Sequence, residues 1–259
     1  DGWQVETIKA DFECKKLLLA TGSNPKIWNV LKTLGYTIVP AVPSLFTFNM
    51  PNESIISLSG IALKNVRIKI LDTKIELTGP ILITHWGMSG PVILKASSIG
   101  ARDLFEKDYS FELQINWLID SNTQVLYKKL ENYSILFSNK LLSKQNPFNL
   151  PARLWLFLLV KFNLDKDKKW GELGKKNMRN FIEFLTKDFY SVTGKTTFKE
   201  EFVTCGGISL ENINIKTMES KIVNDLYFAG EVLDIDGITG GYNFQSAWTT
   251  GFIAGKLGE

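Results

Sequence analysis

The stretch LYFAGEVLDIDGITGGYNFQSAWTTGFIAGK, residues 226–256, decides the fold of this sequence. Leu226 to Ala229 is a short apolar run that predicts a buried strand. Glycines follow, and the helix expected after them carries Ala247, Gly251 and Gly255 four residues apart, where small side chains let a neighbouring element approach closely. The stretch therefore predicts a strand, a glycine-rich turn and a helix.

Such a turn offers unpaired backbone N–H groups and the positive end of a helix dipole, which attract an anion or a carbonyl oxygen. Gly240 and Gly241 would let a flat ring or a phosphate approach the backbone. Glu231 is placed to accept hydrogen bonds from a sugar-like diol, and Asn243 and Gln245 add amides that donate and accept. The alternative is a turn that serves only as a turn, with Glu231 solvating a loop.

The front of the sequence has the same organisation. The apolar run KKLLLAT ends at Thr21 and Gly22, as a buried parallel strand would. A helix is expected next, because Asn24 can cap it, Pro25 suits its first position and Gly35 can end it. The chain thus begins and ends with strand-to-helix units.

The middle of the chain has a different character. Between Tyr36 and Thr84 apolar and polar residues alternate, and RIKILDTKIEL is typical of an antiparallel hairpin. Helices are expected near PVILKASS, NTQVLYKKLENY, PARLWLFLLVKF and KKNMRNFIEFLTK. In the last of these, Met178, Phe181, Ile182 and Leu185 recur at helical spacing, which predicts core packing rather than a cofactor stripe. The middle therefore predicts a separate α+β module, in which the basic stretch 166–176 is interpreted as a solvated loop and helix face rather than a phosphate site.

The single histidine, His85, lies in ILITHWGMSGP, at an expected strand-to-helix turn. Because functional side chains gather at such turns, His85 is a candidate catalytic residue, with a structural role as the alternative. A hydrolase is not expected, since GMSG lacks the G-x-S-x-G spacing of a nucleophile elbow.

Composition limits the possible partners. Lys and Arg number 30 against 27 acidic residues, and the net charge of +3 gives no electrostatic argument for a nucleic-acid partner. Cys14 and Cys205 make neither a disulfide framework nor a metal site, so a cytoplasmic protein without a metal is expected. The longest apolar run, residues 154–160, is shorter than the ~18 to 20 residues that span a membrane. The opening DGWQVETI shows no signal peptide and suggests that a preceding segment is missing.

Three stretches of the sequence resemble one known family. The block from Phe202 to Gly255 closely resembles the C-terminal part of FAD-binding flavoproteins often described as aminoacetone oxidases, which are NAD(P)/FAD-dependent oxidoreductases. THWGMSGP at 84–91 resembles the central motif of that family, and LLLATGSNP at 17–25 resembles the end of its ATG strand. The resemblance covers essentially the whole chain.

The resemblance implies an α/β plus α+β fold: a split FAD domain of the two-dinucleotide-binding type, with an inserted β-rich and helical domain. The FAD domain would comprise residues 1–40 and 201–259, and residues 41–200 would form a β-barrel-like and helical substrate or cap domain. The residues implied to lie near FAD are Gly230, Glu231, Gly240, Gly241, Asn243, Gln245, Thr21 and Gly22. The family's N-terminal G-x-G-x-x-G turn is not in this sequence, and its connection after ATG is shorter here.

The function expected from these observations is hydride transfer between FAD and a small organic substrate or NAD(P)H. His85 and Tyr242 are the groups expected near the substrate, and neither a nucleic acid nor a membrane is expected as a partner. The alternative is a non-catalytic nucleic-acid or protein interaction module that retains a relict flavoprotein fold. Its stacking surfaces would come from the 7 Trp and 17 Phe residues, most of which fall in core patterns.

Overall fold

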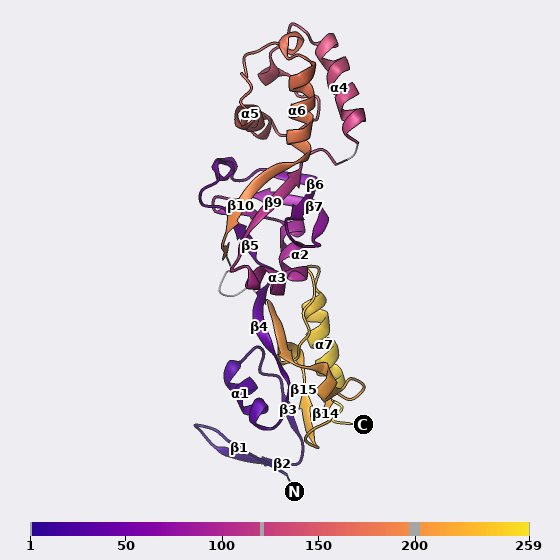
Figure 1. Ribbon diagram of the computed structural model, residues 1–259. Helices are drawn as coiled ribbons and strands as arrows, with labels where there is room; N and C mark the ends of the chain where they lie inside the picture. Colours follow the sequence, from indigo (N-terminus) through magenta and orange to yellow (C-terminus); the bar gives the residue numbers. More distant parts are fainter. Residues whose placement is uncertain (1, 120–121, 197–202, 259) are drawn as a thin grey trace. The chain divides into compact units, whose positions relative to one another are not determined.

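The computed structural model describes residues 2–119, 122–196 and 203–258. The chain divides into two compact units, which are coloured along the sequence in Figure 1. Unit 1 comprises residues 1–45 and 198–259, and unit 2 comprises residues 46–197. The predicted boundary between residues 200 and 201 lies outside the described residues, as does Phe202.

Unit 1 combines short strands with two helices. Its elements are β1 (Trp3–Glu6), β2 (Asp11–Cys14), β3 (Leu17–Leu19), α1 (Pro25–Thr33), β4 (Ile38–Ser44), β12 (Val203–Ile208), η4 (Leu210–Asn212), β13 (Ile213–Asn214), β14 (Glu219–Ser220), β15 (Leu226–Phe228), η5 (Gly230–Val232) and α7 (Tyr242–Ala254). Helix α1 begins as predicted, because the side chain of Asn24 accepts a hydrogen bond from the backbone N–H of Lys26 and Pro25 follows.

Three sheets organise unit 1. Strands β13, β14, β15 and β3 form one sheet in that order, β12 pairs with β4, and β1 pairs with β2. Among the strand pairs of the described residues, β15 with β3 is the parallel one, and it joins segments from near the two ends of the chain. The core beneath contains Trp28, Leu31, Tyr36 and Phe228, with the rings of Tyr36 and Phe228 edge to face at 5.4 Å. Apolar side chains from both ends of the sequence thus share one core.

Unit 2 begins with a sheet and adjoining helices. Its elements are β5 (Thr47–Asn49), η1 (Ser54–Leu58), β6 (Ala62–Ile70), β7 (Glu76–Ile83), β8 (Gly87–Ser89), α2 (Pro91–Ile99), α3 (Ala101–Glu106), β9 (Ser110–Asn116), α4 (Thr123–Leu136), η2 (Leu142–Lys144), α5 (Ala152–Lys161), η3 (Trp170–Glu172), α6 (Lys175–Thr186), β10 (Asp188–Thr193) and β11 (Lys195–Thr196).

The seven strands of unit 2 form one sheet in the order β10, β9, β6, β7, β8, β5, β11. Strands β10 and β11 lie at opposite ends of this order, yet only Gly194 separates them in sequence. Because one residue spans less than ~4 Å, the sheet must curl until its two ends meet. The β6–β7 pair is the antiparallel hairpin predicted from RIKILDTKIEL.

Helices α4, α5 and α6 form the helical part of unit 2, and Figure 1 shows them grouped beyond one end of the sheet. Their core is aromatic: the indole rings of Trp155 and Trp170 stack at 6.3 Å, and Phe181 packs against Trp155. The stripe of Met178, Phe181, Ile182 and Leu185 on α6 is buried, which confirms a packing role. Among the described residues, no helix has the length and apolar character needed to cross a membrane.

Candidate functional site

The parallel pair β3 and β15 brings the two ends of the sequence to one edge. Phe228 is in register with Leu19, and the N–H of Ala229 donates to the Leu19 carbonyl oxygen at 3.1 Å. Both strands therefore end at the same edge of their sheet, the position at which open α/β sheets bind ligands. Thr21 and Gly22 leave β3 here, beside Gly230, which follows β15.

Three glycines of unit 1 adopt backbone conformations that other residues avoid. Gly22, Gly230 and Gly241 have φ angles of +63°, +74° and +84°. A Cβ atom built at Gly22 or Gly241 would meet no heavy atom within 4 Å. The backbone at these two positions is therefore open to the approach of a flat group.

The start of α7 has free hydrogen-bond donors. Gly241 is its N-cap and provides no side chain, and no acceptor in the described part of the chain binds the N–H groups of Tyr242, Asn243 and Phe244. A helix of 13 residues concentrates partial positive charge at this end. The arrangement can hold an electron-rich oxygen of a ligand.

Asn243 has a structural role that sequence reasoning missed. Its Oδ1 accepts from the N–H of Gly237 at 2.8 Å, and its Nδ2 donates to the Gly237 carbonyl oxygen at 3.0 Å. The side chain thereby fixes the turn that leads into α7. Gln245, also predicted at the cofactor, is exposed and donates through Nε2 to Thr249 Oγ1 at 3.1 Å. Contacts of either amide with a cofactor stay predictions.

Two further side chains hold this edge together. Thr250 Oγ1 accepts from the N–H of Gly230 at 2.9 Å and donates to the Ser246 carbonyl oxygen at 2.8 Å, so α7 is tied to the end of β15. The buried indole N–H of Trp28 donates to the Val232 carbonyl oxygen at 2.9 Å and ties α1 to η5. No local motif in the sequence marks these long-range contacts.

The small-residue spacing predicted for α7 has a limited role. Ala247 lies against Gly230, where an added Cβ would sit 4.0 Å from the Ala247 Cβ. At Gly251, however, an added Cβ would meet no heavy atom within 4 Å, so no neighbour in the described residues requires a glycine there. The close approach expected from the sequence is present at one position of the stripe.

Glu231 is the titratable group of this edge. It lies in η5, directly after Gly230, and is half-buried. Burial raises the pKa of its carboxyl group above the ordinary value, because desolvation disfavours the charged form. A carboxyl group in this state can accept hydrogen bonds when ionised and donate one when protonated.

His85, one of the two predicted catalytic residues, belongs to unit 2. It lies in the turn between β7 and β8, is exposed, and contacts Trp86 edge to face with ring centroids 4.3 Å apart. The turn is fixed by a hydrogen bond from the Thr84 N–H to the Gly87 carbonyl oxygen at 2.8 Å. Tyr242 belongs to unit 1, so the two predicted catalytic side chains are not joined within one unit.

Comparison with known proteins identifies the family. Residues 2–257 match the family model described as HI0933-like protein Rossmann domain. The chain belongs to this family. Membership in the HI0933-like family establishes a mixed α/β, Rossmann-like domain with an antiparallel β-rich insertion, and it implies FAD as the cofactor of an oxidoreductase.

Three relatives place the chain within a broader group. It is 30% identical to the ribosomal RNA dihydrouridine synthase of Haemophilus influenzae, over 96% of this chain and 61% of the relative. Identity to the enzyme of the same name from Escherichia coli is 29%, over 94% of this chain and 60% of that protein. Identity to the 3-dehydro-bile acid delta(4,6)-reductase of Clostridium scindens is 24%, over 96% and 64%. The chain spans about three fifths of the length of these relatives, and two names that include ribosomal RNA weaken the expectation of no nucleic-acid partner.

The residues of unit 1 fit part of a bound FAD. The open glycine backbone at Gly22 and Gly241 would accommodate a flat ring, and the uncapped start of α7 would face an electron-rich carbonyl of the flavin. A G-x-G-x-x-G turn for the diphosphate is not in this sequence. The contact of these residues with FAD stays a prediction.

The exposed face of α7 is unusually apolar. Tyr242 is 59% exposed, and Phe244, Trp248 and Phe252 are each 70% exposed. The last three recur every four residues, so they share one side of the helix. A row of large exposed aromatic side chains indicates a surface that a ligand or another protein segment covers.

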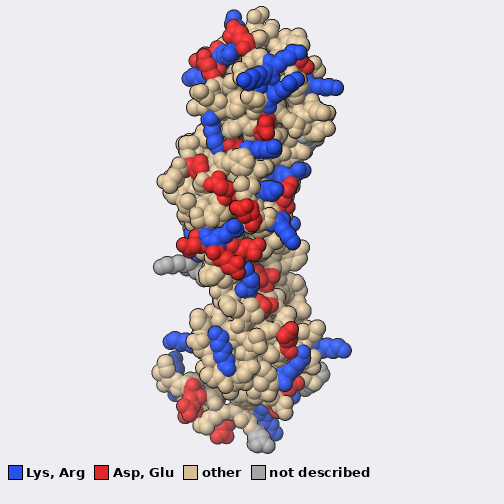
Figure 2. Space-filling model, in the orientation of Figure 1, with Lys and Arg blue, Asp and Glu red and all other residues tan. Residues whose placement is uncertain are grey.

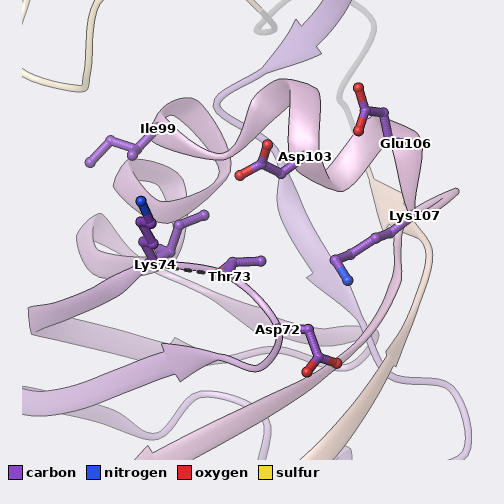
Figure 3. Close-up of a pocket in the computed structure, with 8 residues that line it drawn as sticks. Asp72, Thr73, Lys74, Ile99, Asp103, Glu106 and Lys107 are labelled. Atoms are coloured by element: carbon purple, nitrogen blue, oxygen red, sulfur yellow. Dashed lines mark hydrogen bonds between the residues drawn. The ribbon is translucent and has the colours of Figure 1, made fainter.

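Another cavity lies elsewhere, in unit 2. It has a volume of about 760 Å³ and is lined by the β6–β7 turn and by residues of α2 and α3. Figure 3 shows the carboxylates of Asp72, Asp103 and Glu106 spread around this hollow instead of converging on one point. No cluster of three potential metal ligands occurs in the described parts of the chain. The carboxylates that line the cavity therefore do not form a metal site within the described residues.

Proposed function

We propose that this chain belongs to a FAD-dependent reductase that saturates a carbon–carbon double bond next to a carbonyl group, with uracil bases of RNA as substrates. The observation that carries the proposal is the set of groups that unit 1 presents: Gly22 and Gly230 follow the paired strands β3 and β15, Glu231 comes next in η5, and α7, which Thr250 ties to Gly230, begins without a side-chain cap. These groups provide open backbone at Gly22, free N–H donors at α7 and a half-buried carboxyl group.

The names of the relatives support this reaction class. Dihydrouridine differs from uridine by two hydrogen atoms on a ring double bond beside a carbonyl group, and delta(4,6) denotes ring double bonds in the bile-acid substrate. Such a reduction adds a hydride to one carbon and a proton to the other. RNA is preferred over a steroid because the two relatives named for ribosomal RNA have the higher identities, 30% and 29% against 24%.

Bound FAD would supply the hydride after accepting one from NAD(P)H. The roles of this chain are orientation and proton supply: the N–H groups at the start of α7 would bind a ring carbonyl, and Thr21 with Gly22 would line the nucleotide portion. Tyr242 and His85 stay the proposed groups near the substrate, because a phenol and an imidazole each have a proton to deliver.

The proposal includes the FAD domain that the sequence resemblance implies. A split FAD domain of the two-dinucleotide-binding type needs a G-x-G-x-x-G segment, which longer relatives have room for beyond the three fifths spanned here. The exposed aromatic face of α7 and the outer edge of β3, the last strand in its sheet order, are where such a segment would pack.

Two alternatives lead to different outcomes. Resemblance to aminoacetone oxidases predicts oxidation of a small organic substrate with no requirement for RNA. A relict module that only binds RNA or protein predicts no bound flavin. Bound flavin distinguishes the proposal from the relict module, and the direction of hydride transfer distinguishes it from the oxidase.

The test uses the longer protein that contains this chain, purified and examined by absorbance spectroscopy. We expect flavin bands, bleaching by NADH or NADPH without oxygen, and then conversion of uridine to dihydrouridine in a ribosomal RNA fragment, measured by mass spectrometry. A protein that binds no flavin, or a reduced flavin that leaves uridine unchanged, would refute the proposal.

Matched glycine variants test the site itself. Gly241→Ala and Gly35→Ala each place a methyl group at a positive φ with no atom within 4 Å, so the two cost about the same ~1 kcal/mol of backbone strain. We expect Gly241→Ala alone to weaken FAD binding. Equal affinity in the two variants would remove the start of α7 from the proposed cofactor site.

A further inference from the structure

The net charge of +3 conceals a strong separation of charge along the chain. Residues 123–187, which carry α4, α5 and α6, contain 13 Lys and Arg against 5 Asp and Glu. The remaining residues contain 17 Lys and Arg against 22 Asp and Glu. Figure 2 shows Lys and Arg side chains gathered over the helical part of unit 2, with fewer acidic ones beside them. A polyanion would thus be attracted to the helical part and not to the rest of the chain.

One group of these cations is assembled by backbone pairing. We call Lys140, Lys144, Lys166, Lys168 and Lys169 the lysine cluster. Its two segments pair through hydrogen bonds from the Leu142 N–H to the Lys168 carbonyl oxygen at 2.9 Å and from the Trp170 N–H to the Lys140 carbonyl oxygen at 2.9 Å. The Lys168 side chain is half-buried and the other four are exposed, and within the described residues none of the five forms an ion pair. Asp165 and Asp167 lie in the same loop and leave the cluster a net positive charge.

A groove lies between α4 and α6, and the lysine cluster adjoins α4, because the ring of Tyr133 packs on that of Trp170, next to Lys169, with centroids 5.3 Å apart. The helices run antiparallel, because Glu131 in α4 pairs with Lys175 at the start of α6, whereas residues at the start of α4 line the groove with Thr186 and Lys187. The groove has a volume of about 600 Å³. Helix α4 has 14 residues and is therefore roughly 20 Å long, so groove and cluster together form an extended basic track.

The groove also contains an arginine that lies over a tyrosine ring. The guanidinium of Arg179 lies over the ring of Tyr127, 5.2 Å from its centroid, and both residues line the groove with Lys128. The groove carboxylates are neutralised, since Glu131 pairs with Lys175 at 3.3 Å and Glu183 pairs with Lys187 at 3.3 Å. Planar arginine and aromatic groups stack on nucleobases, and lysines bind phosphates.

We propose that the groove and the lysine cluster together form a docking surface for RNA. The proposal rests on the proposed function, since the same RNA would supply the uracil base that is reduced. The phosphates would lie on the lysine cluster, and an unpaired base would stack on Arg179. The surface would hold the RNA through its backbone phosphates and one unpaired base.

The first experiment measures binding of the 259-residue chain to a fluorescein-labelled RNA hairpin with a uridine-rich loop, by fluorescence anisotropy over a range of salt concentrations. One variant replaces four exposed cluster residues, Lys140, Lys144, Lys166 and Lys169, by Gln. The control replaces Lys9, Lys32, Lys64 and Lys216 by Gln, which are exposed lysines outside the helical part and remove the same charge. Circular dichroism checks that both variants fold.

We expect the cluster variant to bind more weakly and to reduce the slope of log affinity against log salt by about 3, because each phosphate contact contributes roughly 0.7 to 0.9. The control should keep the slope of the unaltered chain. Equal losses in both variants would show a diffuse charge effect and overturn the proposal, as would the absence of RNA binding.

A second variant separates stacking from charge. Arg179→Lys keeps the charge and loses the planar group, so we expect weaker binding with an unchanged salt slope. Binding like that of the unaltered chain would remove Arg179 from the surface. Tighter binding to phosphatidylserine vesicles than to the hairpin would instead indicate a membrane surface and overturn the proposal, because Ile135 and Leu136 are exposed at the end of α4.

These measurements need no flavin. A chain that binds RNA at this surface while the longer protein proves unable to bind FAD would refute the proposed reduction and leave the docking surface standing. If the longer protein reduces RNA with a bound flavin but its RNA affinity does not depend on the lysine cluster, the docking surface would be refuted and the proposed reduction would stand.

Discussion

Asn243 is the side chain whose removal should most directly loosen the turn before α7. Asn243→Ala deletes two hydrogen bonds to Gly237, at 2.8 Å and 3.0 Å. Each such bond contributes about 0.5 to 1.5 kcal/mol, so the turn should lose about 1 to 3 kcal/mol, and the Gly237 amide should exchange with solvent about 5- to 150-fold faster. Affinity for FAD should fall with the order of the turn.

Amide hydrogen exchange of the segment around Gly237, followed by NMR or mass spectrometry, measures this effect locally. Asn243→Asp is an informative second variant, because it keeps an acceptor for the Gly237 N–H but places a carboxylate oxygen opposite the Gly237 carbonyl. We expect Asn243→Asp to retain more protection at the Gly237 N–H than Asn243→Ala does.

Gln245→Ala is the matched control for Asn243. It removes an exposed amide from the same helix, with one bond to Thr249, and should change stability by less than about 0.5 kcal/mol. If the Gly237 amide exchanges at the same rate in the chain with Asn243→Ala and in the chain with Gln245→Ala, the reasoning about the turn is wrong.

Three other perturbations probe the same framework. Thr250→Val keeps the side-chain shape but leaves the N–H of Gly230 without its acceptor, so the urea midpoint should fall by the equivalent of about 1 to 2 kcal/mol. Thr250→Ser keeps the hydroxyl group and should lose less stability. Identical urea midpoints for the two variants would contradict this reasoning. Lys161→Met removes the cation 2.6 Å from Asp188, whose side chain is 1% exposed. In urea unfolding this variant should destabilise unit 2 by up to about 3 kcal/mol, near the lower end of the range for a buried ion pair, because Lys161 is partly exposed. No loss of stability would show that the ion pair is dispensable. Burial raises the folded pKa of Glu231, so the contribution of this group to stability is present at low pH and is lost as pH rises through that pKa. Glu231→Gln should therefore be at least as stable as the unaltered chain at neutral pH, and the difference in stability between the two should narrow in acid. Thermal unfolding that shows a loss of stability for Glu231→Gln at neutral pH would refute the assignment.

Local pattern accounted for much of the secondary structure. Asn24 and Pro25 predicted the start of α1, the alternation in RIKILDTKIEL predicted the β6–β7 hairpin, and Met178 with Phe181 marked the buried face of α6. Each of these signals depends on residues within a few positions of one another, so the sequence carries them directly.

The candidate site was predicted only in part. Gly230 and Gly241 could be singled out because a glycine-rich turn between a strand and a helix is a local pattern. The clamp from Asn243 to Gly237 was not foreseen, because an amide in that position equally suits a ligand. The charge separation of the helical part was within reach of a count over segments, but the net charge of the whole chain conceals it.

The sequence alone determined the start of α1, the β6–β7 hairpin, the glycine turn before α7 and the buried face of α6, since these properties follow from neighbours along the chain. Only the tertiary structure decided that β3 and β15 lie side by side, that Thr250 holds Gly230, and that the curled sheet of unit 2 meets at Gly194. The physical reason is that such contacts depend on how distant segments pack together, and no local pattern of residues records which partner a strand edge or a hydroxyl group will find.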